Sequence, residues 1–279
     1  MILIADSGST KTDWLLFDKN GETIVEVNTI GMNPFFVNTE DIFDALDESK
    51  LSKHIDNIQE VHFYGAGCSD MKKALWLANE LGDFFIKAEV MIKTDIEGAV
   101  FSLAENKPCI ACILGTGASF RIFDGKEIHK KYSSLAYIIG DEGSGTHIAK
   151  ALLRKVFYKQ LPDKLEKAFF EMYNITKDEL LENVYKKSFP NRYLAQFTRF
   201  CTKNINNVII EEIVLNSFRD FATNHLIRLD EINDYPVHFI GSIAHYFAPQ
   251  LQKVAKEMNF KIGTIEQKPL GKLKEYHLK

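Results

Sequence analysis

The stretch that decides the fold opens the chain and reads Met1-Ile-Leu-Ile-Ala-Asp6-Ser-Gly-Ser-Thr-Lys-Thr12-Asp-Trp-Leu-Leu-Phe17. An apolar run ends at Asp6, a loop of small polar residues follows, and a second apolar run continues to Phe17. This order predicts a strand, a tight turn and a second strand. Amides and hydroxyls at such a turn can donate to phosphate oxygens, while a carboxylate can hold a hydrated cation. On this segment alone, an ordinary hairpin with a polar turn is an equal alternative.

Two familiar phosphate loops do not describe this turn. The P-loop requires Gly-x-x-x-x-Gly-Lys-Ser/Thr with a helix after it. Here Thr10 precedes Lys11, and the residues after Lys11 continue as a strand. The dinucleotide-binding fingerprint also opens a helix, so it is excluded for the same reason.

The loop is repeated further along the chain. Cys109–Leu114 is an apolar run, Gly115-Thr-Gly-Ala-Ser119 is a turn of glycine and hydroxyl residues, and a second strand follows at 120–123. In both copies this strand ends in Phe-Asp, at Phe17-Asp18 and at Phe123-Asp124, before a glycine turn. The repeat predicts a duplicated fold that grips a phosphate chain between its halves.

Length and composition favour a globular protein of two domains. The chain has 279 residues, of which 46% are apolar and 26% are charged, with a formal net charge of -4, enough for two cores. This charge gives no electrostatic reason to expect nucleic acid or an anionic membrane as a partner. No apolar run approaches the length of a membrane span, and Asp6 interrupts the first one before a signal peptide could form. We expect a soluble, cytoplasmic protein.

Cys109 and Cys112 form a C-x-x-C pair, which can indicate metal or redox chemistry. In a strand, residues three apart face opposite sides, so the two thiols should not converge. We interpret these cysteines, with Cys68 and Cys201, as buried structural residues.

The remaining patterns divide the chain into two domains. The first hundred or so residues predict the order βββαβαβα, with the first helix running from Thr39 to about Lys53. Asn106-Lys-Pro108 breaks this pattern, and a second meander begins. The chain is then almost wholly helical from 146 to 229, with breaks near Pro162, Asn174 and Pro190. Strands at 235–240 and 261–265 and a closing helix at 269–277 complete the pattern. We predict that a first domain ends at 106 and that a second begins at 107.

Two aspartates are candidates for chemistry. Asp6 ends a buried strand, so its carboxylate must be hydrated, paired or bound to a metal; its alternative role is to cap its own turn. Asp95 follows a strand and starts a helix. It could be a general base that takes a proton from a substrate hydroxyl, or it could be the N-cap of that helix, and these two roles compete.

Two glycine-rich segments lie at helix starts. Gly140-Asp-Glu-Gly-Ser-Gly145 combines glycine with acids, which suits a polar ligand at a helix N-terminus or a capped helix start. Gly241-Ser-Ile-Ala244 lies between a strand and a helix, where an open α/β sheet offers a crevice for a ligand. Close approach of a flat adenine would explain Gly241.

The order of these motifs resembles the actin-like ATPase superfamily of sugar kinases, actin and Hsp70. More closely, the chain resembles the BadF/BadG/BcrA/BcrD-type ATPase family, which includes N-acetylglucosamine kinases. The matching segments run in order along the chain: Asp6–Thr12, Thr94–Ala99, Leu114–Ser119, Gly140–Gly145 and Gly241–Ala244.

The resemblance implies an α/β fold of two actin-like (ribonuclease H-like) domains, each with a mixed sheet flanked by helices, and a large helical insertion in the second. It also implies that a C-terminal helix at 268–279 joins the first domain, 1–106, so that the second domain is 107–267. It implies that ATP and Mg²⁺ bind in the cleft and that the domains close on a sugar. It implies Asp95 as the catalytic base and Asp6 as the magnesium anchor through water. The other implied site residues are Gly8, Ser9, Thr10, Lys11, Thr12, Gly115, Thr116 and Gly117 for the ATP phosphates, Gly241 and Ser242 for adenosine, and Asn33, Ser119, Asp141 and Gly143 for the sugar.

The chain departs from the N-acetylglucosamine kinase pattern at two places near the sugar. The loop Gly115-Thr-Gly-Ala-Ser119 stands where those kinases have Gly-Thr-Gly-Ser-Asn, and Ser134-Leu-Ala-Tyr137 stands where they have a Gly-Trp-Gly element. The kinase chemistry is therefore better supported than the sugar's identity.

We predict ATP-dependent phosphorylation of an amino sugar, first of all N-acetylglucosamine to its 6-phosphate, by a protein that could form a homodimer. Glucosamine is another acceptor to consider. An alternative of another class is an ATPase that activates a partner enzyme, as family members that activate dehydratases do with an iron–sulfur cluster held by cysteines. A nucleotide-binding module without turnover is disfavoured, because the acids that the chemistry needs are present.

Overall fold

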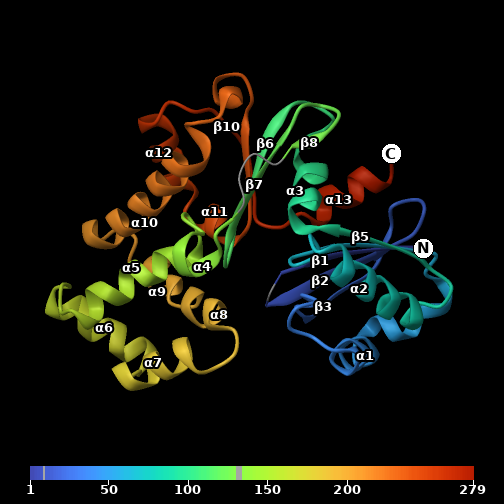
Figure 1. Cartoon of the computed structure of the whole chain (residues 1–279), viewed down its shortest axis with the longest axis horizontal. Coiled ribbons are helices and arrows are strands. Elements are labelled where there is room, and N and C mark those ends of the chain that lie inside the picture. The colour runs from blue at the N-terminus through green and yellow to red at the C-terminus, as the bar shows by residue number, and fades with distance from the viewer. Residues whose placement is uncertain (9, 130–133) are drawn as a thin grey trace. The chain divides into compact units, whose positions relative to one another are not determined.

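The computed structural model describes residues 1–8, 10–129 and 134–279 of the chain. These residues form two compact units (Figure 1). The first is Met1–Lys107 together with Lys268–Lys279, and the second is Pro108–Gln267. Each unit is built on a five-stranded sheet of its own.

The sheet of the first unit has the strand order β3-β2-β1-β4-β5. Strand β1 pairs antiparallel with β2 and parallel with β4, and β4 pairs parallel with β5. The strands are β1 (Ile2–Ser7), β2 (Lys11–Phe17), β3 (Thr23–Ile30), β4 (Glu60–Gly65) and β5 (Glu89–Thr94).

The sheet of the second unit repeats this arrangement, with the order β10-β9-β6-β7-β8. Strand β6 pairs antiparallel with β7 and parallel with β9, and β10 pairs parallel with β9. The strands are β6 (Cys109–Leu114), β7 (Ala118–Phe123), β8 (Ile128–His129), β9 (Val237–Ile240) and β10 (Ile262–Glu266). The same strand order and directions recur, so the duplicated mixed-sheet fold predicted from the two loops is confirmed.

Both faces of the first sheet are covered, which explains why β1 and β2 are apolar without alternation. Leu3 and Trp14 belong to one core, whereas Ile4 and Leu15 belong to another on the opposite face. The helices are α1 (Thr39–Asp47), η1 (Lys50–Asn57, a 3-10 helix), α2 (Met71–Phe84), α3 (Asp95–Leu103) and α13 (Leu270–His277). The C-terminal α13 packs beside α3 (Figure 1).

The helix expected from Thr39 to about Lys53 ends earlier than predicted. Helix α1 stops at Asp47, and Ser49 adopts an extended conformation in which its side chain accepts a hydrogen bond from Leu51 N–H. A new 3-10 helix therefore starts after Ser49, because its hydroxyl caps that segment in place of a continuing α-helical turn.

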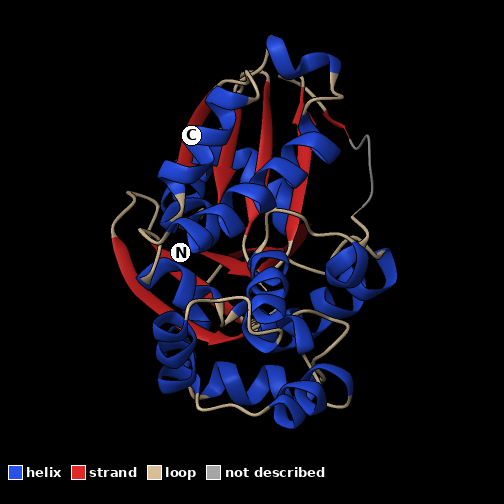
Figure 2. Ribbon diagram, turned by 90° about the vertical axis from the view of Figure 1, so that its left-hand side faces the viewer, coloured by secondary structure: helices blue, strands red, loops and turns tan. Residues whose placement is uncertain are grey.

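The second unit carries a large helical insertion between β8 and β9 (Figure 2). Its breaks fall as expected: Pro162 precedes α6, Asn174 ends α6 with a φ of 43°, and Pro190 is the first residue of α8. The helices are α4 (Ala136–Ile139), α5 (Gly145–Phe157), α6 (Asp163–Tyr173), α7 (Lys177–Tyr185), α8 (Pro190–Ala195), α9 (Thr198–Lys203), α10 (Val208–Phe221), η2 (Ala222–Leu226, a π-helix), η3 (Asp230–Asn233), α11 (Ser242–Tyr246) and α12 (Ala248–Glu257).

Helices α5, α10 and α12 share one apolar core with the second sheet. Cys112 of β6 belongs to that core, whereas Cys109 does not, in line with the opposite sides expected for them. All four cysteines are buried and unbridged. Burial raises the pKa of the Cys109 thiol to about 12, so this thiol is a poor nucleophile and metal ligand.

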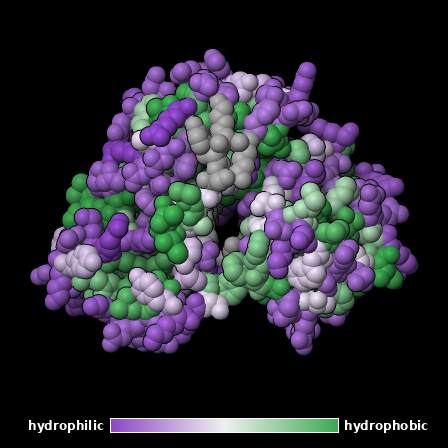
Figure 3. Space-filling model, in the orientation of Figure 1, coloured by the Kyte–Doolittle hydropathy of each residue, from purple (hydrophilic) through white to green (hydrophobic). Residues whose placement is uncertain are grey.

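The visible surfaces of both units are mostly hydrophilic, with apolar residues scattered between (Figure 3). Among the described residues, no helix combines the length and the apolar character that crossing a bilayer would need.

Candidate active site

The first phosphate-type loop joins β1 to β2. Ser7 and Thr12 are paired across the hairpin, and Gly8 N–H donates to the Lys11 carbonyl over 3.0 Å to close the turn. Gly8, Thr10 and Lys11 are exposed. Ser9, also predicted to bind phosphate, lies outside the described residues. The exposed part of the loop is thus available to a ligand.

Thr12 differs from the other residues of this loop because its side chain faces the interior. It is fully buried. Its hydroxyl donates to the Ile30 carbonyl over 2.8 Å, shares a 2.8 Å hydrogen bond with Ser7 Oγ, and accepts from Met32 N–H over 3.3 Å. Thr12 therefore fastens the loop to the end of β3, and a phosphate contact from its hydroxyl stays a prediction.

Asp6 is partly buried near the end of β1. Burial raises the pKa of its carboxyl to about 7, and the neighbouring acids Asp95 and Asp13 add to the shift while two lysines oppose it. Among the described residues, which do not include Ser9 of this turn, no hydrogen bond reaches the Asp6 carboxylate, and both the capping role and the metal role of Asp6 stay predictions. A partly buried carboxylate whose charge is opposed by other acids suits a hydrated divalent cation.

Asp13 is a residue that the sequence reasoning missed. Its side chain is 5% exposed, yet it carries a carboxylate in β2. Lys11 Nζ lies 3.0 and 2.8 Å from its two oxygens, Lys268 Nζ lies 3.2 Å from Oδ1, and the Asn28 amide also donates to it. An acid next to the apolar run Trp14–Phe17 was the available signal, since a buried charge requires partners.

At the start of α3, the two roles considered for Asp95 fall to two residues. Thr94 is the N-cap: its Oγ1 accepts from Glu97 N–H over 3.3 Å, and the Glu97 carboxylate accepts from Thr94 N–H over 2.8 Å. Asp95 is the first helical residue, and its Oδ1 accepts from Ile96 N–H over 2.8 Å. The N-cap alternative for Asp95 is therefore wrong, although one of its oxygens still accepts from a first-turn N–H, and its role as base stays a prediction.

Asn33, predicted to contact the sugar, is buried beside the turn that follows β4. Its Oδ1 accepts from Phe35 N–H over 3.1 Å. Gly67 has a φ of +84°, and a Cβ atom on it would stand 2.4 Å from Asn33 Oδ1. Glycine at 67 is thus what leaves room for the Asn33 amide.

The second phosphate-type loop is fastened to the first turn of α5. Gly115 N–H donates to the Gly117 carbonyl over 3.0 Å. The carbonyls of Gly115 and Thr116 accept from Gly145 N–H over 2.8 Å and from Thr146 N–H over 3.2 Å. Two segments thirty residues apart in sequence are therefore joined by backbone hydrogen bonds, and the Thr146 hydroxyl also donates to the Thr116 carbonyl.

Asp141 and Gly143 belong to the glycine-rich segment 140–145, which leads into α5 and contacts this loop. Ser134 Oγ donates to Asp141 Oδ1 over 2.8 Å. Burial raises the pKa of Asp141, while hydrogen bonds from Ser134 and from Ala118 N–H oppose the rise. Gly143 has a φ of +78°, and its N–H donates to Ser217 Oγ over 3.2 Å. Ser119 is partly buried in β7.

Glu142, the other acid of this segment, serves the fold. Its oxygens lie 3.0 Å from Asn224 Nδ2 and 3.0 Å from His225 Nε2. Burial works against ionisation of Glu142, but hydrogen bonds from its own backbone and from His225 outweigh burial and lower its pKa. The anionic Glu142 therefore holds the glycine-rich segment onto η2.

Gly241 is required by the protein's own backbone. Its φ is +118°, and a Cβ atom would stand 2.4 Å from the Leu114 carbonyl oxygen. The close approach that explains this glycine is therefore that of β6, and not that of an adenine as the sequence suggested. Ser242 begins α11, and contacts of either residue with adenosine stay a prediction.

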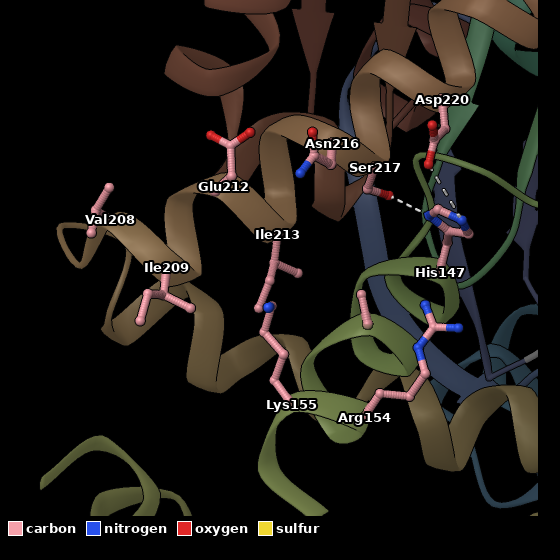
Figure 4. A pocket seen from close by; sticks show the side chains of 11 residues that line it. His147, Arg154, Lys155, Val208, Ile209, Glu212, Ile213, Asn216, Ser217 and Asp220 are labelled. Carbon is pink, nitrogen blue, oxygen red and sulfur yellow. Dashed lines mark hydrogen bonds and ion pairs between the residues drawn. The ribbon is translucent and has the colours of Figure 1, made fainter. Parts of the chain in front are cut away.

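A groove of about 450 Å³ lies between α5 and α10 (Figure 4). At one end, His147 Nδ1 lies 2.8 Å from Ser217 Oγ, and its Nε2 lies 3.9 Å from an Asp220 oxygen. Because Ser217 also accepts from Gly143 N–H, this end of the groove supports the glycine-rich segment. Sequence patterns did not indicate it, since α5 and α10 are far apart in the chain.

Comparisons with solved structures agree with this architecture. A provisionally named N-acetylglucosamine kinase from Porphyromonas gingivalis is 37% identical, with a TM-score of 0.94 over 100% of this chain and 99% of that one. A provisionally named N-acetylglucosamine kinase from Chromobacterium violaceum is 13% identical, with a TM-score of 0.74 over 100% and 98%. A ROK family glucokinase from Streptomyces griseus, solved with glucose and AMPPNP, is 13% identical, with a TM-score of 0.64 over 99% and 97%. The last two matches show the fold alone.

The family model for BadF/BadG/BcrA/BcrD ATPases matches residues 5–274, which include both phosphate-type loops and the Asp95 segment. Together with the duplicated actin-like fold and the 37% identical relative, this match shows which family the chain belongs to. It belongs to the BadF/BadG/BcrA/BcrD ATPase family.

Proposed function

We propose that this protein is an ATP-dependent kinase that phosphorylates the primary hydroxyl of an amino sugar, with N-acetylglucosamine as the first acceptor to test. Membership of an ATPase family and the provisional name of the 37% identical relative support this proposal. The observation that carries it is the start of α3, where Thr94 and Glu97 form the cap and Asp95 is the first helical residue, with a charge that contributes to the raised pKa of Asp6.

In this proposal, Asp95 accepts the proton of the attacking hydroxyl, as phosphoryl transfer to an alcohol requires. Gly8, Thr10 and Lys11 of one unit and Gly115, Thr116 and Gly117 of the other would bind the phosphates through amides, a hydroxyl and a lysine. Asn33 and Asp141 would hold the acceptor. Asp6 would anchor Mg²⁺ through water, and the metal, when bound, would neutralise charge on the phosphates.

The sharpest test is a coupled assay of ADP release over a panel of acceptors: N-acetylglucosamine, glucosamine, N-acetylmannosamine, N-acetylmuramate and glucose. We expect release to depend on one acceptor and a sugar phosphate to form. Asp95→Asn should lower kcat by about a thousandfold while AMPPNP binding is retained. Near-normal turnover in Asp95→Asn would refute the role of Asp95 as base.

The alternative is an ATPase that activates a partner enzyme through a cysteine-held iron–sulfur cluster. The four cysteines are buried, and the thiols of Cys109 and Cys112 belong to different sides of β6. No group of three or more histidine, cysteine or acidic residues that could hold a metal occurs among the residues described. Equal ADP release in every well, with or without sugar, would favour this alternative over the kinase.

A further inference from the structure

Two lysines from opposite ends of the chain meet at the buried carboxylate of Asp13. Lys11 Nζ contacts both oxygens, at 3.0 and 2.8 Å, while Lys268 Nζ contacts Oδ1 at 3.2 Å. The Asp13 side chain is 5% exposed, whereas those of Lys11 and Lys268 are 51% and 42% exposed. A buried anion therefore has two cations that each reach it from the surface.

Lys11 has a second task under the proposed function, because it is the cation of the phosphate-binding loop. A single ammonium group cannot fully serve a phosphate chain and both oxygens of Asp13 at once. If Lys11 were the only partner, its departure would leave a buried carboxylate uncompensated, which is strongly unfavourable. Phosphate binding would then be weakened by the free energy that it costs to leave the Asp13 carboxylate buried without a cation.

Lys268 removes this conflict. It stands at the point where the chain re-enters the first unit, directly before Pro269 and α13. Its contact with Oδ1, together with the Asn28 amide on the same oxygen, does not depend on Lys11. We propose that Lys268 is a positioning residue. As the counter-ion of Asp13, it stays paired with that carboxylate while Lys11 binds the phosphates of the nucleotide.

This inference rests on the proposed role of Lys11 and goes beyond it, since it gives a task to a residue outside every phosphate motif. It differs from a direct contact between Lys268 and phosphate, because under the counter-ion role the effect of Lys268 should vanish when residue 13 carries no charge. It also differs from a purely structural ion pair, which would change stability without changing nucleotide affinity.

The test is a double-mutant cycle read by calorimetric titration with AMPPNP and Mg²⁺. Lys268→Met should weaken binding about tenfold, because Lys11 becomes the only cation on Asp13. In an Asp13→Asn background, the same Lys268→Met change should alter affinity by less than about twofold. Lys268→Arg should restore affinity, and in steady state Lys268→Met should raise KM for ATP while leaving kcat largely unchanged.

Lys274→Met is the matched control. Lys274 also lies in the C-terminal segment and is bound to Thr23 Oγ1 at 3.0 Å, with no part in the Asp13 network. This variant should bind AMPPNP like the parent. Thermal unfolding of each variant without nucleotide shows that it is folded before affinity is compared.

Two results would overturn the proposal. One is unchanged affinity in Lys268→Met, and the other is an equal loss in the parent and Asp13→Asn backgrounds, which would mean direct phosphate contact. Lys11→Met separates this proposal from the proposed function. If Lys11→Met leaves AMPPNP affinity unchanged, the phosphate role of Lys11 itself is wrong. If Lys11→Met weakens binding and Lys268→Met does not, only the counter-ion role of Lys268 falls.

Discussion

The Asp141 carboxylate lies against the backbone of Gly117: a Cβ atom on Gly117 would stand 2.8 Å from Asp141 Oδ2. The second phosphate-type loop and the glycine-rich segment before α5 are thus in direct contact. Gly117, which is proposed to bind phosphate, and Asp141, which is proposed to bind the acceptor, therefore depend on the same close contact. Glycine at 117 is what permits it.

Gly117→Ala should displace the Asp141 carboxylate by several tenths of an ångström, since a Cβ contact this short does not occur. Because Asp141 is proposed to bind the acceptor, we expect KM for the sugar to rise about tenfold or more, with a smaller change in KM for ATP. Initial rates at varied sugar and varied ATP measure both constants.

Gly115→Ala is the control for this change, since an added Cβ there meets nothing within 4 Å. An equal rise of the sugar KM in both variants would contradict the proposed link between Gly117 and Asp141. A loss confined to ATP binding in Gly117→Ala would do the same.

Substitution of Thr94 should mainly affect stability, whereas substitution of Asp95 should mainly affect catalysis. Thr94→Ala removes the N-cap of α3 and should lower the free energy of unfolding by about 1 kcal/mol. Asp95→Asn keeps that cap and relieves repulsion from Asp6, so its effect on stability should stay within about 0.5 kcal/mol. Urea unfolding measures both.

Turnover should show the opposite order for these two variants. Thr94→Ala should keep most of its kcat below its unfolding midpoint, whereas Asp95→Asn should lose it. A stability loss in Asp95→Asn as large as in Thr94→Ala would return the capping role to Asp95.

These residues also show how far the sequence could predict the molecule. The strands and their order along the chain could be predicted from the sequence, because β1 and β6 are continuous apolar runs and the two hairpins have the same pattern. Capping was not accessible, because Thr94 and Asp95 are both good N-caps and only the backbone of residue 94 decides between them. The helix break at Ser49 was missed for a related reason, since a local hydroxyl contact outweighed the apolar periodicity.

The missed parts of the site depend on contacts between distant segments. One of the two cations that compensate the buried Asp13 is Lys268, 255 residues later in the chain. Gly241 is explained by the carbonyl of Leu114, and the His147–Ser217 contact joins two separate helices. The spacing of motifs carries no information on such pairs. The sequence therefore indicated the phosphate-type loops but not the distant residues that hold them in place.

Asp6 predicts a dependence of stability on pH. Its carboxyl has a pKa of about 7 in the folded protein, against 3.8 as the ordinary value, because of burial and then of Asp95 and Asp13. Between these values the folded state binds more protons than the unfolded state, so the contribution of Asp6 to stability falls as pH rises from about 4 to about 7. Below this range the contribution is constant.

The measurement is the unfolding midpoint of the parent and of Asp6→Asn over this range without Mg²⁺. The difference between the two proteins should shift in favour of Asp6→Asn as pH rises, because asparagine has no proton to lose. Adding Mg²⁺ above pH 7 should stabilise the parent and leave Asp6→Asn unaffected. A constant difference between the two proteins would refute the raised pKa.

His277 predicts a pH dependence of the opposite sign. Its ring in α13 shares a 2.8 Å hydrogen bond with Tyr64 OH and packs against His62, with ring centroids 3.8 Å apart and ring planes tilted by 36°. Burial, and then the neighbouring His62 and Lys93, lower the pKa of His277 to about 4, while Glu60 opposes the shift. Between about 4 and the ordinary 6.5, the unfolded chain binds the proton that the folded chain excludes.

Stability should therefore fall as pH drops through this window, and part of that fall should belong to His277. His277→Gln can keep a hydrogen bond to Tyr64 but cannot be protonated, so its unfolding midpoint should fall less between pH 6.5 and 4 than that of the parent. Tyr64→Phe removes the hydrogen bond and should cost about 1 kcal/mol at neutral pH. Equal slopes for the parent and His277→Gln would show that protonation of His277 does not loosen α13 from β4.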